Sequence, residues 1–333
     1  MRTNSIVGLL LTAAVAATAY AADSNYKVVE RIKVGDGGFD YAVFDTANDR
    51  VLIARTDYTM AIDAKTGKVS ELASASAGHM AIPIPGTNLL VLPRGKGTVA
   101  IVDGKADKPI AELPAGNGPD GAAYDPFSKF VFVMNHNGGD ATVVDPIAQK
   151  VVATIPVGGV LEFPASDGAG KVFVNVQDKG EIGVIDVKTR KTVAHWPMND
   201  CKSPTGLAYV PRGKLLVSSC GQNGVAKVIN ADTGAEVASL PIAVGADAVM
   251  YDAKRNVVLI PCRAGELEVI SVADPAHISV VQRVPTQEGS RTGTFDPGTG
   301  RVYAMAAKFG PPATPGGRPQ ALPGTFEVLV VAP

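Results

Sequence analysis

The chain repeats one strand-and-turn pattern about every 42 residues. Each copy holds short apolar segments separated by turn residues. A period of this length with four strands per unit is typical of the blades of a β-propeller. Seven copies therefore predict an all-β fold, a seven-bladed β-propeller with four-stranded antiparallel blades. Aligned on the turn after their first strand, the copies have the anchor residues Asp45, Ile84, Asp125, Asp167, Val210, Asp252 and Asp296, spaced 39 to 44 residues apart.

The third copy illustrates the four strands. Its segments 121–124, 130–134, 141–145 and 150–155 are rich in β-branched and aromatic residues and are predicted as strands a, b, c and d. The 36 Gly and 24 Pro residues of the chain supply turns. Five of the seven anchors are Asp, which accepts backbone N–H groups in turns, so we interpret them as structural residues of the a–b turn.

The two ends of the chain are expected to complete one blade together. The seventh copy stops after its third strand, "FEVLVVAP", whereas the unmatched segment 26–34, "YKVVERIKV", is of the d type. The N-terminal strand would then complete the last blade and close the ring, which removes exposed sheet edges. Residues 22–333 thus form a single propeller domain. The Pro/Gly-rich segment 308–325 is an insertion between strands b and c of blade seven, in which we expect no regular structure.

The first residues have the layout of a secretory signal peptide, predicted to span residues 1–21. Arg2 precedes an apolar run at 6–17 that is short for a membrane span, and the small residues Ala19 and Ala21 suit a cleavage site. An uncleaved anchor is the alternative. No other segment approaches membrane length, so we expect a periplasmic or secreted protein without a membrane span in the mature chain.

Several copies resemble a known family. "TMAIDAKTGKVSEL", "GEIGVIDVKTRKTVAHWPM" and "AKVINADTGAEVASLPIAVG" are similar to the YVTN-type β-propeller repeat, and "KVFVN" resembles its namesake strand. The chain as a whole is most similar to exported bacterial YncE-like proteins. This resemblance implies the propeller fold. It leaves the function open, because such propellers bind ligands or nucleic acid, serve as scaffolds or surface-layer proteins, accompany redox enzymes or act as lactonases.

The first residue of strand a differs in chemistry from copy to copy. This position lies five residues before each anchor and is expected at the mouth of the central channel. Such a ring could bind a hydrated divalent cation, because hard cations favour several oxygens and the single histidine also admits a transition metal. Alternatively, these polar residues only cap the d–a loops and hydrate the channel. The seven residues are Asp40, His79, Asp120, Glu162, Thr205, Asp247 and Arg291, of which Asp40, His79, Asp120, Glu162 and Asp247 are the candidate metal ligands.

Basic residues are expected on the same face, where strand b ends. Arginine presents paired donors to carboxylate or phosphate, so these residues predict a rim for a small anionic ligand. His136, in the turn "MNHNGGD", has no counterpart in the other copies. Few aromatic residues accompany the rim, and 31 basic against 32 acidic residues give no overall field, so nucleic-acid binding is only weakly supported. The candidate ligand-binding residues are Arg55, Arg94, His136, Arg263 and Arg291.

Three cysteines occur, Cys201, Cys220 and Cys262. Cys201 and Cys220 fall on one face of blade five, so a Cys201–Cys220 disulfide is the preferred pairing in an oxidising compartment. Cys262 occupies the position equivalent to Cys220 in the next blade. A Cys220–Cys262 link or a soft-metal site therefore stays open.

Common enzyme motifs are missing, including phosphate-binding glycine loops, a nucleophilic-serine motif and the Cys-x-x-Cys-His sequence for covalent haem. We therefore expect a monomeric, exported, non-catalytic propeller that binds a small anion, a metal ion or a partner protein on the face of its d–a and b–c loops. Two alternatives remain. One is a metal-dependent lactonase in which axial carboxylates hold the cation and His79 moves a proton. The other is an accessory propeller of a periplasmic redox system.

Overall fold

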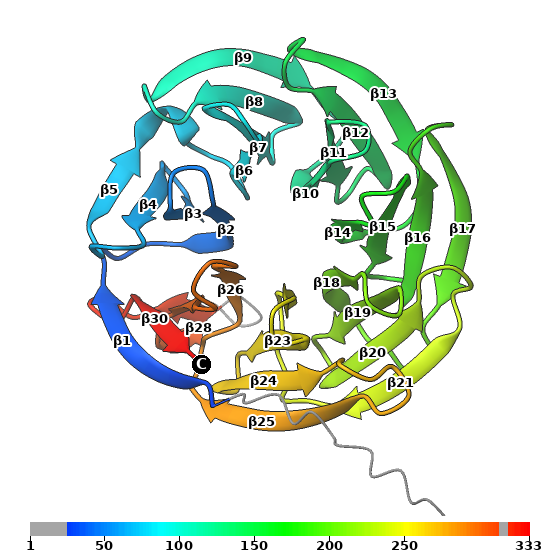
Figure 1. The fold of residues 1–333 in the computed structure, drawn as a ribbon. Coiled ribbons are helices and arrows are strands. Elements are labelled where there is room, and N and C mark those ends of the chain that lie inside the picture. The colour runs from blue at the N-terminus through cyan, green and yellow to red at the C-terminus, as the bar shows by residue number, and fades with distance from the viewer. Residues whose placement is uncertain (1–24, 313–318) are drawn as a thin grey trace, which may run out of the picture.

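The computed structural model describes residues 25–312 and 319–333. These residues form seven four-stranded antiparallel sheets arranged in a ring, so the predicted seven-bladed β-propeller is confirmed (Figure 1). Strand a of each blade lies nearest to the axis and strand d at the rim (Figure 1). The predicted signal peptide, residues 1–21, lies outside the described residues. No helix in the described ranges has the length and apolar character to cross a membrane.

Six blades follow one another along the chain. Blade one is β2 (Phe39–Asp45), β3 (Arg50–Arg55), β4 (Thr59–Asp63) and β5 (Val69–Leu72), followed by the 3₁₀-helix η1 (Ala73–Ala75). Blade two is β6 (Ile82–Pro83), β7 (Leu89–Arg94), β8 (Thr98–Asp103) and β9 (Lys108–Pro114), and blade three is β10 (Pro119–Asp125), β11 (Phe130–Asn135), β12 (Asp140–Asp145) and β13 (Lys150–Pro156). Blade four is β14 (Leu161–Ser166), β15 (Lys171–Val176), β16 (Glu181–Asp186) and β17 (Lys191–Pro197), and blade five is β18 (Pro204–Val210), β19 (Leu215–Cys220), β20 (Val225–Asn230) and β21 (Glu236–Pro241). Blade six is β22 (Met250–Asp252), β23 (Val257–Cys262), β24 (Glu266–Ser271) and β25 (Ser279–Pro285).

Blade seven is assembled from both ends of the chain. Its strands are β26 (Thr292–Phe295), β27 (Val302–Ala306), β30 (Glu327–Ala332) and, at the rim, β1 (Lys27–Lys33). β1 pairs antiparallel with β30, from Lys27 opposite Ala332 to Lys33 opposite Glu327. The predicted closure by the N-terminal strand is therefore confirmed.

The hydrophobic core lies between neighbouring blades. Central strands b and c carry aliphatic side chains on both faces, so each sheet packs against the sheets on either side. Val217 of β19 and Ile260 of β23 belong to one such cluster, and both are fully buried. The anchor aspartates hold the a–b turns as predicted: buried Asp125 accepts the backbone N–H and the hydroxyl of Ser128 at 2.8 and 2.6 Å.

The insertion 308–325 contains regular structure, contrary to our expectation. Its described ends form the antiparallel hairpin of β28 (Phe309–Pro312) and β29 (Pro319–Ala321). The prolines are accommodated because this two-stranded ribbon is all edge, where a missing N–H breaks no central ladder. The backbone N–H of Gly324 binds the carboxylate of Asp36 at 2.8 and 2.7 Å, which ties the insertion to the loop before β2.

We expect Tyr26→Phe to weaken the closure of the ring. The Tyr26 hydroxyl is buried and donates to Asp252 Oδ2 at 2.9 Å, which links the start of β1 to blade six. Losing this bond to a charged acceptor should lower the free energy of unfolding by about 1–3 kcal/mol in a denaturant titration. Val29→Thr, at an exposed position of the same strand, is the matched control and should change it by about 0.5 kcal/mol or less. Equal effects of the two variants would contradict this role of Tyr26.

Candidate functional site

The first residues of the inner strands converge at one end of the channel. Asp40, Asp120 and Glu162 lie in β2, β10 and β14, whereas His79, Asp247 and Arg291 lie just before β6, β22 and β26. All six line one cavity of about 470 Å³, here called the mouth cavity. Thr205 is not part of this lining; its hydroxyl donates to the carbonyl of Ala246 at 2.8 Å. The full lining is Asp40, Tyr41, His79, Gly95, Gly118, Asp120, His136, Asn137, Glu162, Gln177, Asp247 and Arg291.

Glycines allow these groups to approach one another. A Cβ atom at Gly121 would lie 3.0 Å from the carbonyl oxygen of Glu162, so β10 and β14 are in close contact beside the mouth cavity. A Cβ atom at Gly95 would lie 2.7 Å from His79 Nε2, so this glycine leaves room for the imidazole. Small residues at these points therefore set how tightly the polar groups are packed.

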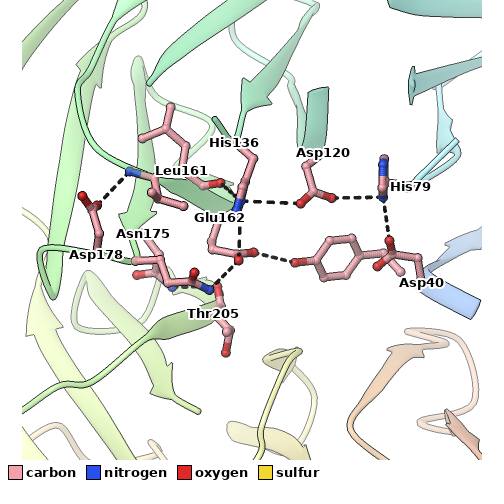
Figure 2. A network of polar contacts seen from close by, with 12 residues as sticks. Asp40, His79, Asp120, His136, Leu161, Glu162, Asn175, Asp178 and Thr205 are labelled. Atoms are coloured by element: carbon pink, nitrogen blue, oxygen red, sulfur yellow. Dashed lines mark hydrogen bonds and ion pairs between the residues drawn. The ribbon is translucent and has the colours of Figure 1, made fainter. Parts of the chain in front are cut away.

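Asp40, His79 and Asp120 form the first part of a chain of polar contacts (Figure 2). His79 Nδ1 lies 2.7 Å from Asp40 Oδ2 and 3.6 Å from Asp120 Oδ1. These three residues come from three different blades. The ring of the propeller, rather than any local motif, brings them together.

His136 and Glu162 continue the chain on the other side of Asp120 (Figure 2). His136 Nδ1 lies 3.7 Å from Asp120 Oδ2, 3.6 Å from Glu162 Oε1 and 2.9 Å from the carbonyl oxygen of Leu161. Tyr41 donates its hydroxyl to Glu162 Oε2 at 3.1 Å, and the Gln177 amide donates to Oε1 at 2.5 Å. Glu162 is thus held in place, with only 10% of its side chain exposed.

Crowding and burial raise the pKa values of the carboxyl groups. Burial, then the charges of Asp120 and Asp247, raise the pKa of Glu162 to about 8. Burial and the charge of Asp40 raise the pKa of Asp120 to about 7, although nearby His79 opposes the shift. The hydrogen bond that His79 donates to the Asp40 carboxylate raises the pKa of His79. Near neutral pH this cluster therefore retains protons that isolated carboxyl groups would lose.

Arg291 compensates part of the negative charge. Its Nε lies 3.2 Å from Asp247 Oδ2, and its guanidinium lies 5.7 Å from the centre of the Phe39 ring. Burial raises the pKa of Asp247, and Arg291 counteracts this effect. Of the described carboxylates that line the mouth cavity, Asp40, Asp120 and Glu162 thus have no lysine or arginine partner.

The donor atoms suit a metal ion. One oxygen or nitrogen each from Asp40, His79 and Asp120 lies within 4.8 Å of the others, and the same holds for Asp120, His136 and Glu162. Carboxylate oxygens with imidazole nitrogen favour divalent transition metals over Mg²⁺ or Ca²⁺, which prefer oxygen alone. Asp247, the fifth candidate ligand, shares the cavity but is engaged by Arg291.

Two of the expected rim residues are used elsewhere. Arg55 is 3% exposed; its Nε donates to the carbonyl of Gly38 at 2.7 Å and its Nη2 to that of Gly35 at 2.9 Å. Arg94 likewise donates from Nε to Ser76 at 3.1 Å. Both side chains therefore fold back onto d–a loops and satisfy carbonyl groups there, and a role of Arg55 and Arg94 in ligand binding stays a prediction.

Arg263 and Arg291 instead line a second cavity, of about 620 Å³, next to the hairpin. We call it the insertion cavity; besides the two arginines its walls include Phe39, Phe309 and Phe326. Arg263 is exposed and forms no ion pair with the described residues. Arg291 belongs to both cavities, so the insertion lies beside the mouth of the channel.

The cysteines lie away from the mouth cavity. Cys201 and Cys220 form a disulfide in the structure, between the loop that enters blade five and the end of β19. Cys262 is a free, buried thiol, and burial raises its pKa. The described residues thus pair the cysteines as preferred from the sequence, and the Cys220–Cys262 link is not formed.

Two residues of the site, Tyr41 and Gln177, were not predicted from the sequence. Tyr41 follows Asp40 in β2, and successive side chains of a strand point to opposite faces. Tyr41 was therefore not expected near the other site residues, yet its hydroxyl reaches Glu162. Gln177 occupies the position at the end of strand b where other copies have Arg55 and Arg94. Because its side chain is neutral, it was not selected as a candidate for binding an anion. The only cue for both is their position in the aligned repeat.

Comparison with known proteins agrees with the fold. No family model matches the chain, and no curated protein sequence matches it. A chain from "Crystal Structure of Mitotic Checkpoint Complex" is similar with a TM-score of 0.76 and 12% identity, over 100% of this chain and 99% of that one. A chain of hydrazine synthase from Kuenenia stuttgartiensis is similar with a TM-score of 0.73 and 18% identity, over 83% of this chain and 94% of that one. At such identities the likeness shows the fold alone.

We expect the metal-free protein to lose stability as pH rises from about 4 to 8. An unfolded Asp ionises near its ordinary pKa of about 3.9. Folded Asp120 ionises at about 7. The folded state therefore binds more protons between these values, and its free energy of unfolding falls with rising pH.

Asp120→Asn should remove the part of this loss that Asp120 causes, whereas the part caused by Glu162, whose pKa is raised to about 8, should remain. In thermal unfolding with a chelator, the variant should match wild type near pH 5 and exceed it by roughly 1–4 kcal/mol at pH 8. Asp57→Asn, at an exposed position in blade one, should follow wild type throughout. A wild-type profile that stays flat from pH 5 to 8 would contradict the crowding of these carboxyl groups.

Proposed function

We propose that this protein is an exported, non-catalytic binding propeller of the YVTN type that holds a divalent transition-metal ion at its channel mouth. One observation carries the proposal: donor atoms of Asp40, His79 and Asp120, from three blades, lie within 4.8 Å of one another. Packing demands alone would favour similar residues at a repeated position. Unlike residues that converge on one point indicate a ligand instead.

The charges in the cavity support a cation. Asp40, Asp120 and Glu162 repel one another in a partly buried place, and the pKa of Asp120 and of Glu162 is raised as a result. A divalent ion would take the place of the retained protons and remove the repulsion. Arg291, from the blade that follows that of Asp247, likewise provides a positive charge that counteracts the rise in the pKa of Asp247 caused by burial.

Export is supported by the leader-like residues 1–21 and by the cysteines. A disulfide such as Cys201–Cys220 persists in an oxidising compartment such as the periplasm or the extracellular space. Divalent metals reach both compartments, so a metal-binding role fits this location. The accessory role beside a redox enzyme gains no support from the likeness to hydrazine synthase, because 18% identity shows the fold alone.

Metal-dependent lactone hydrolysis is the second candidate. It is favoured because His79, whose pKa is raised, lies with its Nδ1 2.7 Å from Asp40 Oδ2 and 3.6 Å from Asp120 Oδ1, and could transfer a proton beside a cation held by carboxylates. The cation would polarise the lactone carbonyl, and His79 would carry the proton. Turnover of a lactone panel by the metal-loaded protein, lost in Asp120→Asn, would favour this function over binding alone.

Purified protein is first freed of metal by chelation. In isothermal titration calorimetry we expect it to bind Zn²⁺ most tightly, Mn²⁺ more weakly and Ca²⁺ most weakly. Asp120→Asn should weaken Zn²⁺ binding at least about tenfold, since the loss of even an outer-shell partner has that effect. Asp57→Asn is the control and should leave the affinity unchanged. If wild type binds none of the three ions, or if both variants bind Zn²⁺ as wild type does, the metal proposal fails.

The insertion cavity would receive a small anionic ligand beside the metal. Arg263 and Arg291 offer donors for a carboxylate, and Phe39, Phe309 and Phe326 offer apolar walls. The cavity therefore suits an organic carboxylate with a flat apolar part.

Benzoate is a simple probe of this cavity. We expect it to bind with a dissociation constant on the order of 1 mM in a ligand-observed NMR titration. Arg263→Met should weaken binding roughly tenfold or more, because a hydrogen bond to a charged group is lost. Arg212→Met, an exposed arginine of blade five, should leave it unchanged. Equal binding by all three proteins would exclude the insertion cavity as the carboxylate site.

A further inference from the structure

Asp120 lies between two histidines and directs one carboxylate oxygen to each. Its Oδ1 lies 3.6 Å from His79 Nδ1, and its Oδ2 lies 3.7 Å from His136 Nδ1. Each histidine has a second carboxylate of its own: Asp40 lies 2.7 Å from His79, and Glu162 lies 3.6 Å from His136. The cluster therefore consists of two similar halves that share Asp120 (Figure 2).

We propose that the channel mouth holds two adjacent divalent transition-metal ions bridged by the Asp120 carboxylate. His79 and Asp40 bind one ion, and His136 and Glu162 bind the other. This inference rests on the proposed function, because it adds a second ion to the same cavity. Both halves satisfy the distance condition for a metal site, with all three donor atoms within 4.8 Å.

The donor set fits a two-metal centre. Two histidines with four carboxylates are also the ligands of di-iron and di-manganese carboxylate proteins, which have an unrelated helical fold. Here three carboxylates belong to the candidate triads, and a fourth, Asp247, lines the same cavity but pairs with Arg291. In two-metal sites the ions lie about 3.5–4 Å apart, a separation that one carboxylate spans with its two oxygens. Asp120 is the only described residue common to both candidate triads.

The surroundings fix the donors in place. Tyr41 and Gln177 each hold one oxygen of Glu162. His136 Nδ1 donates to the carbonyl of Leu161 at 2.9 Å, so this hydrogen bond must give way for Nδ1 to bind an ion. Asp120 Oδ1 is fully buried and has no hydrogen-bond partner among the described residues. A buried, unpaired carboxylate oxygen that faces an imidazole nitrogen is costly to maintain unless a cation binds it.

A second ion would reverse the net charge of the mouth cavity. When ionised, the four carboxylates carry −4, and Arg291 brings the total to −3 with neutral histidines. One divalent ion leaves −1, whereas two ions give +1. The loaded centre would then attract a small oxyanion from the side of the insertion cavity, where Arg263 also lies. Two ions thus explain why cationic side chains stand next to an acidic cluster.

The number of bound ions tests the proposal. Metal-free mature protein is dialysed against Mn²⁺, and the metal bound per chain is measured by elemental analysis. We expect two ions per chain. The electron paramagnetic resonance spectrum of the loaded wild-type protein should show an exchange-coupled pair, since a bridging carboxylate places the two ions close together.

Single replacements should separate the two halves. His136→Gln and His79→Gln should each bind one ion per chain fewer and give the spectrum of an isolated Mn²⁺ ion. His277→Gln is the matched control, because this histidine is 82% exposed and lies in the loop before β25, and it should keep two coupled ions. Circular dichroism of each variant checks that the β fold is retained.

The outcomes distinguish this inference from the proposed function. One ion per chain in wild type, unchanged in His136→Gln, would overturn the two-metal centre and leave the single-ion function standing. Two ions without exchange coupling would overturn the bridge by Asp120. No bound ion at all would overturn both. The wild-type spectrum needs no variant, so the test does not depend on whether the replaced proteins fold.

Discussion

The pairing of β1 with β30 is the constraint on which the other features of this propeller depend. β1 begins at Lys27 and β30 ends at Ala332, so the ring closes only when the two ends of the chain meet. Closure completes the seventh four-stranded sheet and fixes the seven inner strands around one axis. Their first residues then surround one opening, and groups as far apart in sequence as Asp40 and Glu162 line the same cavity. A local motif could not bring these residues together.

The carboxyl groups of the candidate site are held in positions that lower the stability of the folded protein. Asp120 and Glu162 are held near other carboxylates and away from water, which raises the pKa of each. Similar groups at the anchor position have the opposite role: Asp125 is buried and hydrogen-bonded within its own turn. The aspartates at the anchor position and those at the start of strand a therefore differ in whether nearby groups hydrogen-bond and stabilise their charged form. The unsatisfied set marks where the protein is suited to bind a ligand.

Much of the fold and part of the site could be predicted because the repeat fixes the register. Asp40 and Asp120 lie five residues before their anchor residues. This spacing alone places them at the mouth of the channel, without knowledge of any tertiary contact. Side-chain paths were not predictable in this way: Arg55 begins at the expected place, but its long chain turns back to the carbonyls of Gly35 and Gly38. The hairpin β28–β29 was missed because Pro and Gly argue against strands in general, whereas an edge ribbon tolerates them.

Anomalous X-ray diffraction from crystals soaked in Mn²⁺ or Zn²⁺ would test the central claim, that unlike residues at one repeated position converge to bind metal. We expect anomalous peaks in the mouth cavity within about 2.0–2.3 Å of an Asp120 oxygen and of a histidine nitrogen. The His79–Asp40 hydrogen bond should be replaced by bonds to the ion. A cavity without an anomalous peak, in which His79 keeps its contact with Asp40, would contradict the account.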